Sequence, residues 1–371
     1  MSKRTAVVKI GTSSITDRDG RITPAAIEKL CAEVAEARKA GFDVVVVTSG
    51  AIAAGLPLLG LPLQGLSAGR SADPAVLQAA SAVGQSHLVG FYNRALGAHG
   101  LLGGQVLLAP LDFIHRQQYL HARQTLRVLL DLGVVPIVNE NDAVADDEIR
   151  FGDNDRLAAL VAHLCRAEVL VLLTDTPGLL TADPRVQGGG SLIEEIVAVD
   201  HDLEQLAGGP GSPRGSGGMA SKLAAGKIAA WSGVRAVIAA ADRPGVLAAA
   251  LAGEARVGTV FVPRERCLSA RRLWIAFVVG ASGTVVVDAG ARSALLERGV
   301  SLLPAGVIGV RGSWSADDAV EIAAADGRVF AKGLVRYSSA VLAELAGRRS
   351  AELPSDVPRE VVHRDDLVLV P

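Results

Sequence analysis

Carboxylate and carboxamide side chains are concentrated in one stretch of the chain, between residues 139 and 155. They are Asn139, Glu140, Asn141, Asp142, Asp146, Asp147, Glu148, Asp153, Asn154 and Asp155. The apolar run 134–138 predicts a short buried strand before the stretch. Apolar residues at helical spacing up to Leu164 predict a helix after it, capped by Asp153 or Asn154. Open α/β sheets bind ligands at the carboxyl ends of their strands, so we expect an amino-acid or metal-phosphate site here. A solvated acidic loop is the alternative.

Two lysines lie next to loops of the kind that bind phosphate. The chain has 37 Lys and Arg residues, of which only seven are Lys, so a Lys within a motif is notable. Lys9 lies near the end of an apolar strand and precedes a small, hydroxyl-rich loop. Lys222 follows the glycine-rich stretch 208–218 and falls in the first turn of an expected helix, where a cation opposes the helix dipole unless an anion is bound. The alternative for Lys9 is a strand-end residue whose ammonium group reaches solvent. The alternative for 208–218 is a flexible linker.

Two further strand ends carry polar residues. Ser49 follows one strand and precedes Gly50 and a helix, so this turn offers a hydroxyl and backbone N–H groups to an anion. Thr174 and Asp175 follow another strand, where they either face a nucleotide or cap an ordinary turn.

Alternating strands and helices must position these residues. We expect strands over 5–10, 42–47, 105–109, 134–138, 168–173, 234–240 and 257–262, and helices over 23–40, 73–96, 117–132 and 219–231. This alternation indicates an α/β fold with parallel strands and helices on both faces of the sheet. From about Ala281, short apolar runs at 284–287, 307–310 and 329–331 alternate with Gly and Asp turns. We therefore expect a catalytic domain over 1–262, a linker over 263–280 and a small β-rich domain over 281–371.

Composition excludes several classes of protein. The 371-residue chain is 50% hydrophobic with a net charge of −2, which suits a large buried core and gives no global attraction to nucleic acid. Its three cysteines are odd in number and far apart, which argues against a disulfide framework or a zinc site. No apolar run is long enough to cross a bilayer, and Met1 to Arg4 lead directly into a strand, so we expect a cytoplasmic protein with no membrane partner.

Seven segments in the amino-terminal two thirds resemble, in order, the motifs of glutamate 5-kinases, members of the amino-acid kinase family. They are VVKIGTSSIT (7–16), TSGAIAAG (48–55), AVGQ (82–85), PIVNENDAVA (136–145), FGDNDRLAALVA (151–162), LLTDTPGLLTADP (172–184) and GSGGMASKL (215–223). The tail resembles a PUA domain, most clearly over VVVDAGARSALLERGVSLLPAGV (285–307). The resemblance implies a three-layer sandwich with a mostly parallel sheet, followed by the PUA domain. It also implies phosphorylation of the L-glutamate side-chain carboxylate by ATP, the first step of proline biosynthesis.

The resemblance also implies roles for individual residues. It places Ser49, Asp142 and Asn154 on glutamate. It places the nucleotide on Lys9, Thr174, Asp175, Ser216, Gly217, Gly218, Met219, Ala220, Ser221 and Lys222. Lys9 and Lys222 would stabilise the transferring phosphoryl group with Asp155 between them, and Mg²⁺ would bridge the phosphates, with no protein metal ligand predicted. The γ-carboxylate of glutamate has an ordinary pKa near ~4.3, so such a nucleophile needs no general base.

The resemblance further implies inhibition by proline, a homo-oligomer (dimer or tetramer) and a downstream glutamyl-phosphate reductase as a possible partner. Arg150 stands where the family usually has Lys, which leaves its role open. One alternative is an amino-acid kinase that acts on another carboxylate or on carbamate. Another is an RNA-binding protein, which the tail disfavours because from residue 281 it has ten Lys and Arg against twelve Asp and Glu. Lys332 and Arg336 would share one face at most.

Overall fold

The structure is a computed structural model that describes residues 4–61, 73–109, 111–144, 154–182, 190–199, 201–207, 218–265, 267–349, 352 and 358–370. The chain divides into two compact units, Met1–Cys267 and Leu268–Pro371. The boundary falls inside the expected linker 263–280. Helix α11 (Ala270–Phe277) belongs to the second unit, where Arg271 bonds Asp366 at 2.6 Å.

The first unit is built on one eight-stranded sheet with the strand order β3-β4-β2-β1-β5-β7-β8-β6. Its strands are β1 (Arg4–Ile10), β2 (Phe42–Thr48), β3 (Gly103–Leu108), β4 (Val135–Glu140), β5 (Val169–Thr174), β6 (Glu195–Ile196), β7 (Arg235–Ala240) and β8 (Thr259–Phe261). Neighbouring strands pair in parallel except for β7 and β8. The predicted mostly parallel α/β sheet is therefore confirmed, and the predicted strands match to within two residues at each end.

The expectation that the strand near 257–262 is parallel to its neighbour is wrong. β8 runs antiparallel to β7, with Ile238 opposite Thr259. The connecting helix α10 (Val246–Ala252) has only 7 residues. The end of this helix nevertheless lies beside the first residue of β7, where Arg235 Nη2 donates to the Ala250 carbonyl oxygen at 2.7 Å. The segment after α10 then returns towards the carboxyl end of β7, where Arg243 Nη1 donates to the Arg256 carbonyl oxygen at 2.9 Å, so the chain enters the sheet there and runs in the opposite direction.

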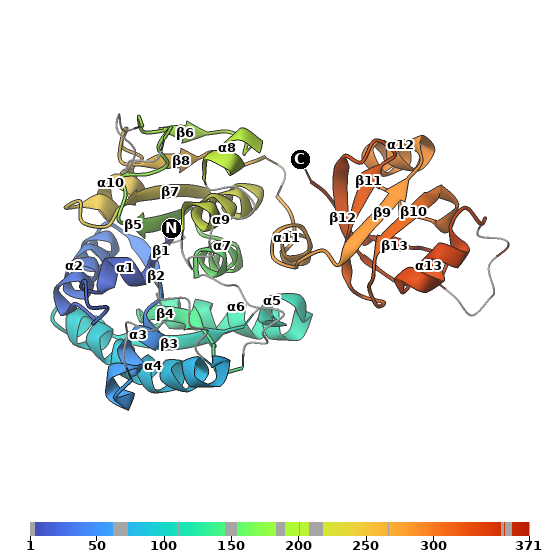
Figure 1. The fold of residues 1–371 in the computed structure, drawn as a ribbon. Helices are drawn as coiled ribbons and strands as arrows, with labels where there is room; N and C mark the ends of the chain where they lie inside the picture. The colour runs from blue at the N-terminus through green and yellow to red at the C-terminus, as the bar shows by residue number, and fades with distance from the viewer. Residues whose placement is uncertain are drawn as a thin grey trace. The chain divides into compact units, whose positions relative to one another are not determined.

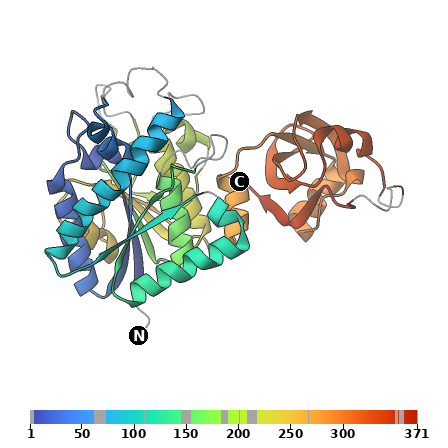
Figure 2. The same ribbon diagram turned by 90° about the horizontal axis from the view of Figure 1, so that it is seen from below.

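Helices cover both faces of this sheet, which gives the three layers visible in Figures 1 and 2. One face carries α2 (Pro24–Lys39), α4 (Pro74–Gly97) and α10, together with the short helices α1 (Thr12–Ile15) and α3 (Ala51–Gly55). The other face carries α6 (Arg116–Asp131), α7 (Asn154–Cys165) and α9 (Met219–Trp231). Short segments complete the unit: η1 (Pro57–Leu59), α5 (Leu111–Ile114) and α8 (His201–Leu206).

Side-chain alternation along β1 determines which face Lys9 meets. Ala6, Val8 and Ile10 belong to the hydrophobic core on the side of α2 and α10. Since successive side chains of a strand point to opposite faces, Lys9 points to the face covered by α7 and α9. Its side chain is buried there, 2% exposed.

Close packing between α3 and α4 depends on two glycines. A Cβ at Gly55 would lie 1.8 Å from the carbonyl oxygen of Ala80, and a Cβ at Gly84 would lie 1.8 Å from that of Ala51. The two helices therefore touch backbone to backbone. This contact places α4 beside the turn that follows Ser49.

The second unit has its own five-stranded sheet, in the order β10-β9-β11-β12-β13. The strands are β9 (Gly283–Val287), β10 (Val307–Gly312), β11 (Ala319–Ala324), β12 (Val329–Val335) and β13 (Val362–Leu369), and the other elements are α12 (Ala289–Arg298), η3 (Pro304–Gly306) and α13 (Ser339–Leu345). Trp314, Phe330 and Tyr337 contribute to its separate core. The predicted small β-rich domain is confirmed, although β11 and β13 were not predicted.

A search of the described residues for a helix with the length and apolarity needed to span a membrane finds none.

Replacing Gly84 by Ala is expected to lower the free energy of unfolding by about 1–3 kcal/mol or more, because the new methyl group would overlap the Ala51 carbonyl and force α3 and α4 apart. Gly97→Ala is the matched control, since it changes the same residue type in the same helix but meets nothing within 4 Å. It should leave stability unchanged or raise it by up to about 1 kcal/mol. Urea denaturation followed by circular dichroism measures both, and equal effects of the two changes would contradict the packing argument.

Candidate active site

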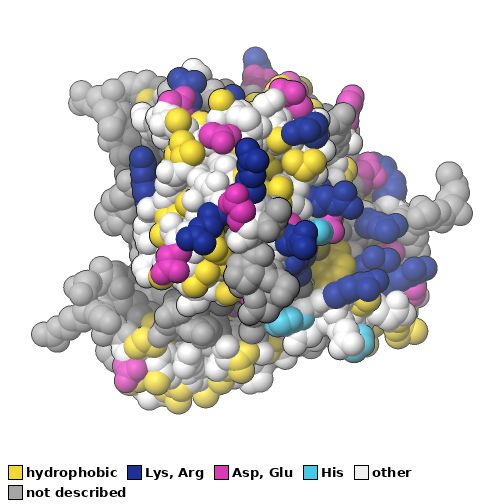
Figure 3. All heavy atoms as spheres, turned by 90° about the vertical axis from the view of Figure 1, so that its right-hand side faces the viewer, with side chains coloured by type: hydrophobic (Ala, Val, Ile, Leu, Met, Phe, Trp, Pro, Cys, Tyr) yellow, Lys and Arg dark blue, Asp and Glu magenta, His cyan; other side chains and the backbone are white. Residues whose placement is uncertain are grey.

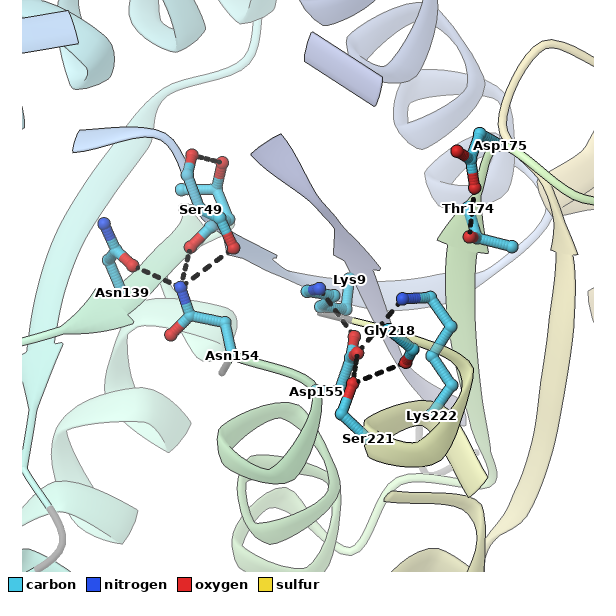
Figure 4. A network of polar contacts seen from close by, with 11 residues as sticks. Lys9, Ser49, Asn139, Asn154, Asp155, Thr174, Asp175, Gly218, Ser221 and Lys222 are labelled. Carbon is cyan, nitrogen blue, oxygen red and sulfur yellow. Dashed lines mark hydrogen bonds and ion pairs between the residues drawn. The ribbon is translucent and has the colours of Figure 1, made fainter. Parts of the chain in front are cut away.

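The candidate site lies along one edge of the first unit's sheet. Strands β4, β2, β1 and β5 are consecutive neighbours and run parallel, so their carboxyl ends meet at the same edge. At or next to these ends lie Asn139, Ser49, Lys9 and Thr174. Most of the residues expected from the sequence to do chemistry are therefore neighbours in space (Figure 4).

Two lysines from distant parts of the chain meet on one carboxylate. Lys9 Nζ lies 2.5 Å from Asp155 Oδ1, and Lys222 Nζ lies 3.2 Å from Asp155 Oδ2. All three side chains are buried, with exposed fractions of 2%, 5% and 0% for Lys9, Lys222 and Asp155. Buried charges are costly unless they are paired, so these three side chains hold one another in place. We call this group the ionic cluster.

The ionic cluster keeps its carboxylate ionised. Burial raises the pKa of Asp155, but the charges of Lys9 and Lys222 and the hydrogen bonds from Lys9 and Ser221 outweigh burial, so this pKa lies below its ordinary value of 3.8. Asp155 is also in the first turn of α7, where the helix dipole favours a negative charge. Lys222 is in the first turn of α9, and Asp155 supplies the anion that this position requires.

The start of α9 is tied to the ionic cluster through Ser221. Its hydroxyl donates to Asp155 Oδ2 at 2.7 Å and also lies 2.8 Å from the Gly218 carbonyl oxygen. The first N–H groups of a helix have no partner within the helix and can bind phosphate oxygens. α9 therefore presents backbone donors and Lys222 at one point.

The second part of the site is a group of amide side chains around Asn154. Asn154 Nδ2 donates to the Thr48 carbonyl oxygen at 2.8 Å, to Ser49 Oγ at 3.0 Å and to Asn139 Oδ1 at 2.8 Å. Gly50 follows Ser49 in the left-handed region, at φ +98°, which lets the chain turn directly from β2 into α3. We call this group the amide cluster. The sequence did not predict that the side-chain amide of Asn154 would bond residues at the ends of β2 and β4.

Asn154 and Asp155 are adjacent in the sequence and belong to different clusters. Asn154 contacts residues at the ends of β2 and β4, whereas Asp155 contacts Lys9 of β1 and Lys222 of α9. Figure 4 shows the two clusters side by side at the start of α7. α7 fits between the sheet, α6 and α9 because its apolar residues are buried on all sides, among them Leu157, Leu160 and Val161.

Other residues predicted for the site are placed nearby or lie outside the described residues. Thr174 donates to Asp175 Oδ1 at 3.0 Å at the end of β5, on the far side of Lys222 from Asn154. Asp142 accepts a hydrogen bond from Ser81 at 2.6 Å, which links the segment after β4 to α4. Gly218 directly precedes α9, and Met219 and Ala220 are its first residues. Arg150, Ser216 and Gly217 are outside the described residues.

The predicted cap of α7 is partly corrected. Asn154 is the first residue of the helix, and its side chain bonds Thr48, Ser49 and Asn139 instead of capping the helix. The other predicted cap, Asp153, lies outside the described residues.

Sequence reasoning missed three residues that contact the predicted ones. Asn139 was seen only as part of the polar stretch, and Ser81 and Gln85 only as part of a helix. The structure buries all three and bonds them to Asn154, Asp142 and Asn139, respectively. A usable signal was present, because Ser81 and Gln85 are polar residues four apart within an Ala-rich helix, which places them on one helix face.

Within the described part of the chain, no group of three or more His, Cys, Asp and Glu side chains is arranged to hold a metal ion. Both oxygens of Asp155 face ammonium groups. Asp175 is the described carboxylate at this end of the sheet that is exposed to solvent. Magnesium usually keeps several waters and binds one or two carboxylates together with substrate phosphates, and Asp175 fits that limited role.

Two family models match the chain. The amino acid kinase family matches residues 4–240, and the PUA domain matches residues 283–356. Among curated relatives, a glutamate 5-kinase of Mycolicibacterium vanbaalenii is 46% identical over 99% of this chain and 97% of the relative. A glutamate 5-kinase of Nocardia farcinica is 45% identical over 100% of this chain and 98% of the relative.

Among solved structures, a carbamate kinase from Giardia lamblia bound to AMP-PNP covers 71% of this chain and 99% of its own, with a TM-score of 0.50 and 16% sequence identity. At that identity the likeness shows the fold alone, and the fold is that of the first unit.

Asp155→Asn should destabilise the protein by about 3–5 kcal/mol at neutral pH, because two buried ammonium groups lose their anion. The folded-state pKa of Asp155 lies below 3.8, so its contribution to stability is complete above that pH and is lost as the pH falls below it towards the folded-state value.

Unfolding free energies of both proteins, measured by denaturant titration from pH 6 down to the acid limit of the folded state, check this prediction. The difference between wild type and variant should shrink as the pH falls below 3.8. A difference that stays constant or grows on acidification would show that the carboxylate is not held ionised by the lysines.

Proposed function

Since the chain belongs to the amino acid kinase family and, within it, to the glutamate 5-kinases, we propose that it transfers the γ-phosphoryl group of ATP to the side-chain carboxylate of L-glutamate. The product is γ-glutamyl phosphate. The observation that supports this most directly is the convergence of Lys9 and Lys222 on Asp155 beside the amide cluster. One part of the site is suited to phosphate charge and the adjoining part to an amino acid.

The main obstacle to this reaction is electrostatic. The attacking carboxylate and the triphosphate are both anions, and a carboxylate with an ordinary pKa near ~4.3 is already ionised at neutral pH. No general base is required, so the protein contributes alignment and positive charge. Lys9 and Lys222 supply that charge from two sides of the transferring group, and Asp155 keeps both ammonium groups oriented before ATP binds.

The acceptor side of the site is assigned to the amide cluster. Ser49 and Asn154 bind glutamate directly in this proposal, and Asp142 contributes from the loop that Ser81 holds. The Asn154–Asp155 peptide joins this side to the ionic cluster, so the bound carboxylate lies next to the lysines.

The nucleotide side is assigned to Thr174, Asp175 and the start of α9. Gly218, Met219, Ala220 and Ser221 lead into Lys222, and their backbone N–H groups at the helix start suit the phosphates. The nucleotide assignment also includes Ser216 and Gly217, which directly precede Gly218 and are outside the described residues. Asp175 would hold Mg²⁺ together with the phosphates of ATP, and the ion would supply charge neutralisation there.

We further propose a cytoplasmic enzyme of proline biosynthesis that is inhibited by proline and forms a homo-oligomer, a dimer or tetramer. The product is an acyl phosphate, which is prone to hydrolysis, so a glutamyl-phosphate reductase as a downstream partner fits its chemistry. Whether Arg150 takes part in catalysis is not assigned.

A second candidate function is RNA binding through the second unit. The match to the PUA domain is the observation that favours it. Several basic side chains of this unit are paired with acids, for example Arg271 with Asp366 at 2.6 Å and Arg336 with Glu360 at 3.6 Å. Lys332 lies on strand β12 and donates to the Val279 carbonyl oxygen. Figure 3 shows acidic, basic and hydrophobic side chains together on the face that it views. That the protein has no salt-dependent affinity for RNA stays our prediction.

ADP release should depend on L-glutamate and should fall when free proline is added. The coupled assay is run with Mg-ATP and, separately, glutamate, aspartate, N-acetylglutamate and carbamate as acceptors. Glutamate should be the best acceptor. Activity with another acceptor and none with glutamate would replace the proposed function by that of a different amino-acid kinase, and unchanged activity with proline would remove the inhibitor from the proposal.

Lys222→Ala should lower kcat by about 10²–10³, because one preorganised charge opposite the transferring phosphoryl group is lost. The KM for glutamate should change little, since Lys222 belongs to the ionic cluster and not to the amide cluster. Lys227→Ala is the matched control on the same helix, where the ammonium pairs with Glu204 at 3.1 Å, and it should keep wild-type kinetics. A fully active Lys222→Ala enzyme would show that this residue has no role in phosphoryl transfer.

A further inference from the structure

The orientation of the amide cluster is set by backbone groups of Glu140. Gln85 Nε2 donates to the Glu140 carbonyl oxygen at 3.3 Å, and Asn139 Oδ1 accepts from the Glu140 backbone N–H at 2.9 Å. A backbone carbonyl can only accept and a backbone N–H can only donate. These two contacts therefore fix the orientation of the side-chain amides of Gln85 and Asn139.

The orientation is passed on from Gln85 to Asn154. Asn139 Nδ2 donates to Gln85 Oε1 at 3.2 Å, so the oxygen of Asn139 faces Asn154. Asn154 must then present its NH₂ group to Asn139, and the Thr48 carbonyl oxygen requires the same orientation. The three side chains form a directed chain of hydrogen bonds that starts on α4 and ends at the start of α7.

The last atom of this hydrogen-bond chain is an acceptor for which the described residues supply no partner. Asn154 Oδ1 is buried, and no hydrogen-bond partner for it is found among the described residues. Leaving a buried acceptor unsatisfied is unfavourable, so a ligand that brings an N–H donor to this atom gains a hydrogen bond that the described part of the chain does not make. Ser49 Oγ accepts from Asn154 Nδ2 and can donate its own hydrogen to a ligand oxygen.

We propose that Gln85 is a positioning residue that acts through Asn139 to keep Asn154 Oδ1 turned towards the substrate, as the acceptor for a cationic α-amino group. This inference rests on the proposed function. At neutral pH glutamate has two carboxylates, which only accept hydrogen bonds, and one ammonium group, which only donates. The ammonium group is therefore the part of glutamate that matches Asn154 Oδ1, and the Ser49 hydroxyl matches a carboxylate.

The position of Gln85 suits this role. It is 7% exposed on the face of α4 that also carries Ser81, which donates to Asp142 at 2.6 Å. One face of one helix therefore holds both Asn139 and Asp142. The backbone contact between Gly84 and Ala51 fixes the distance of this helix from the turn after Ser49.

The test compares L-glutamate with glutarate, which has both carboxylates but no α-amino group. Wild-type enzyme should prefer glutamate, with a kcat/KM at least about 10-fold higher, because glutarate leaves the buried acceptor unsatisfied. Gln85→Leu removes the first member of the hydrogen-bond chain. It should raise the KM for glutamate about 10-fold to 100-fold with a much smaller change in kcat. The preference for glutamate over glutarate should fall by a similar factor.

Two further variants control for structural damage. Gln85→Glu keeps an acceptor for Asn139 Nδ2 but loses the N–H donor to the Glu140 carbonyl oxygen, so its KM and its preference should lie between those of wild type and Gln85→Leu. Ser86→Ala changes the next residue of α4, which is exposed and bonds only the Val83 carbonyl oxygen among the described residues, and it should behave as wild type. The preference is a ratio measured within one preparation, so a smaller folded fraction does not change it.

A wild-type enzyme that uses glutarate as well as glutamate would overturn the inference and leave the proposed function standing, even if the Gln85 variants failed to fold. A Gln85→Leu enzyme that keeps the wild-type preference would overturn it as well. Absence of glutamate-dependent ADP release in the wild type would instead remove the proposed function itself.

Discussion

The pairing of Lys9 and Lys222 with one buried carboxylate, that of Asp155, is the interaction on which the site depends. A buried charge without a partner costs several kcal/mol, so the fold is stable only if β1, α7 and α9 bring these three groups together. The same requirement places two ammonium groups at one point of the sheet edge. In the proposed function, stability and phosphoryl transfer therefore rely on the same two lysines, whose ammonium groups Asp155 holds at this point.

A single helix start organises both sides of the site. Asn154 and Asp155 are consecutive, yet one side chain is held by amide groups and the other by ions. The helix behind them is packed on all sides by the sheet, α6 and α9, so its first turn has little freedom to move. Acceptor and phosphoryl group must meet within about 3–3.5 Å for in-line transfer, and a rigid element that carries both binding sides meets that demand better than two separate loops.

Much of the first unit follows from local patterns. Each predicted strand and helix of this unit is present, because buried strands read as short apolar runs and their ends are marked by Gly, Asp and Ser. The predicted direction of β8 was wrong, since the direction depends on where the segment after α10 brings the chain back to the sheet. In the second unit β11 and β13 were missed, because β11 (AVEIAA) is rich in Ala and β13 (VHRDDLVL) contains four polar residues in a row, and both become strands by pairing with β9 and β12.

By itself the sequence determined which residue types stand at the strand ends and helix starts, and the resemblance to glutamate 5-kinases named most of the residues found at the site. Only the tertiary structure decided that positions 9 and 222 meet on Asp155, that Ser81 donates to Asp142, and that Asn139 bonds both Gln85 and Asn154. The physical reason is range. Periodicity and turn chemistry act over a few neighbouring residues, whereas these contacts depend on strand order and on hydrogen-bond directions set by backbone groups far away along the chain.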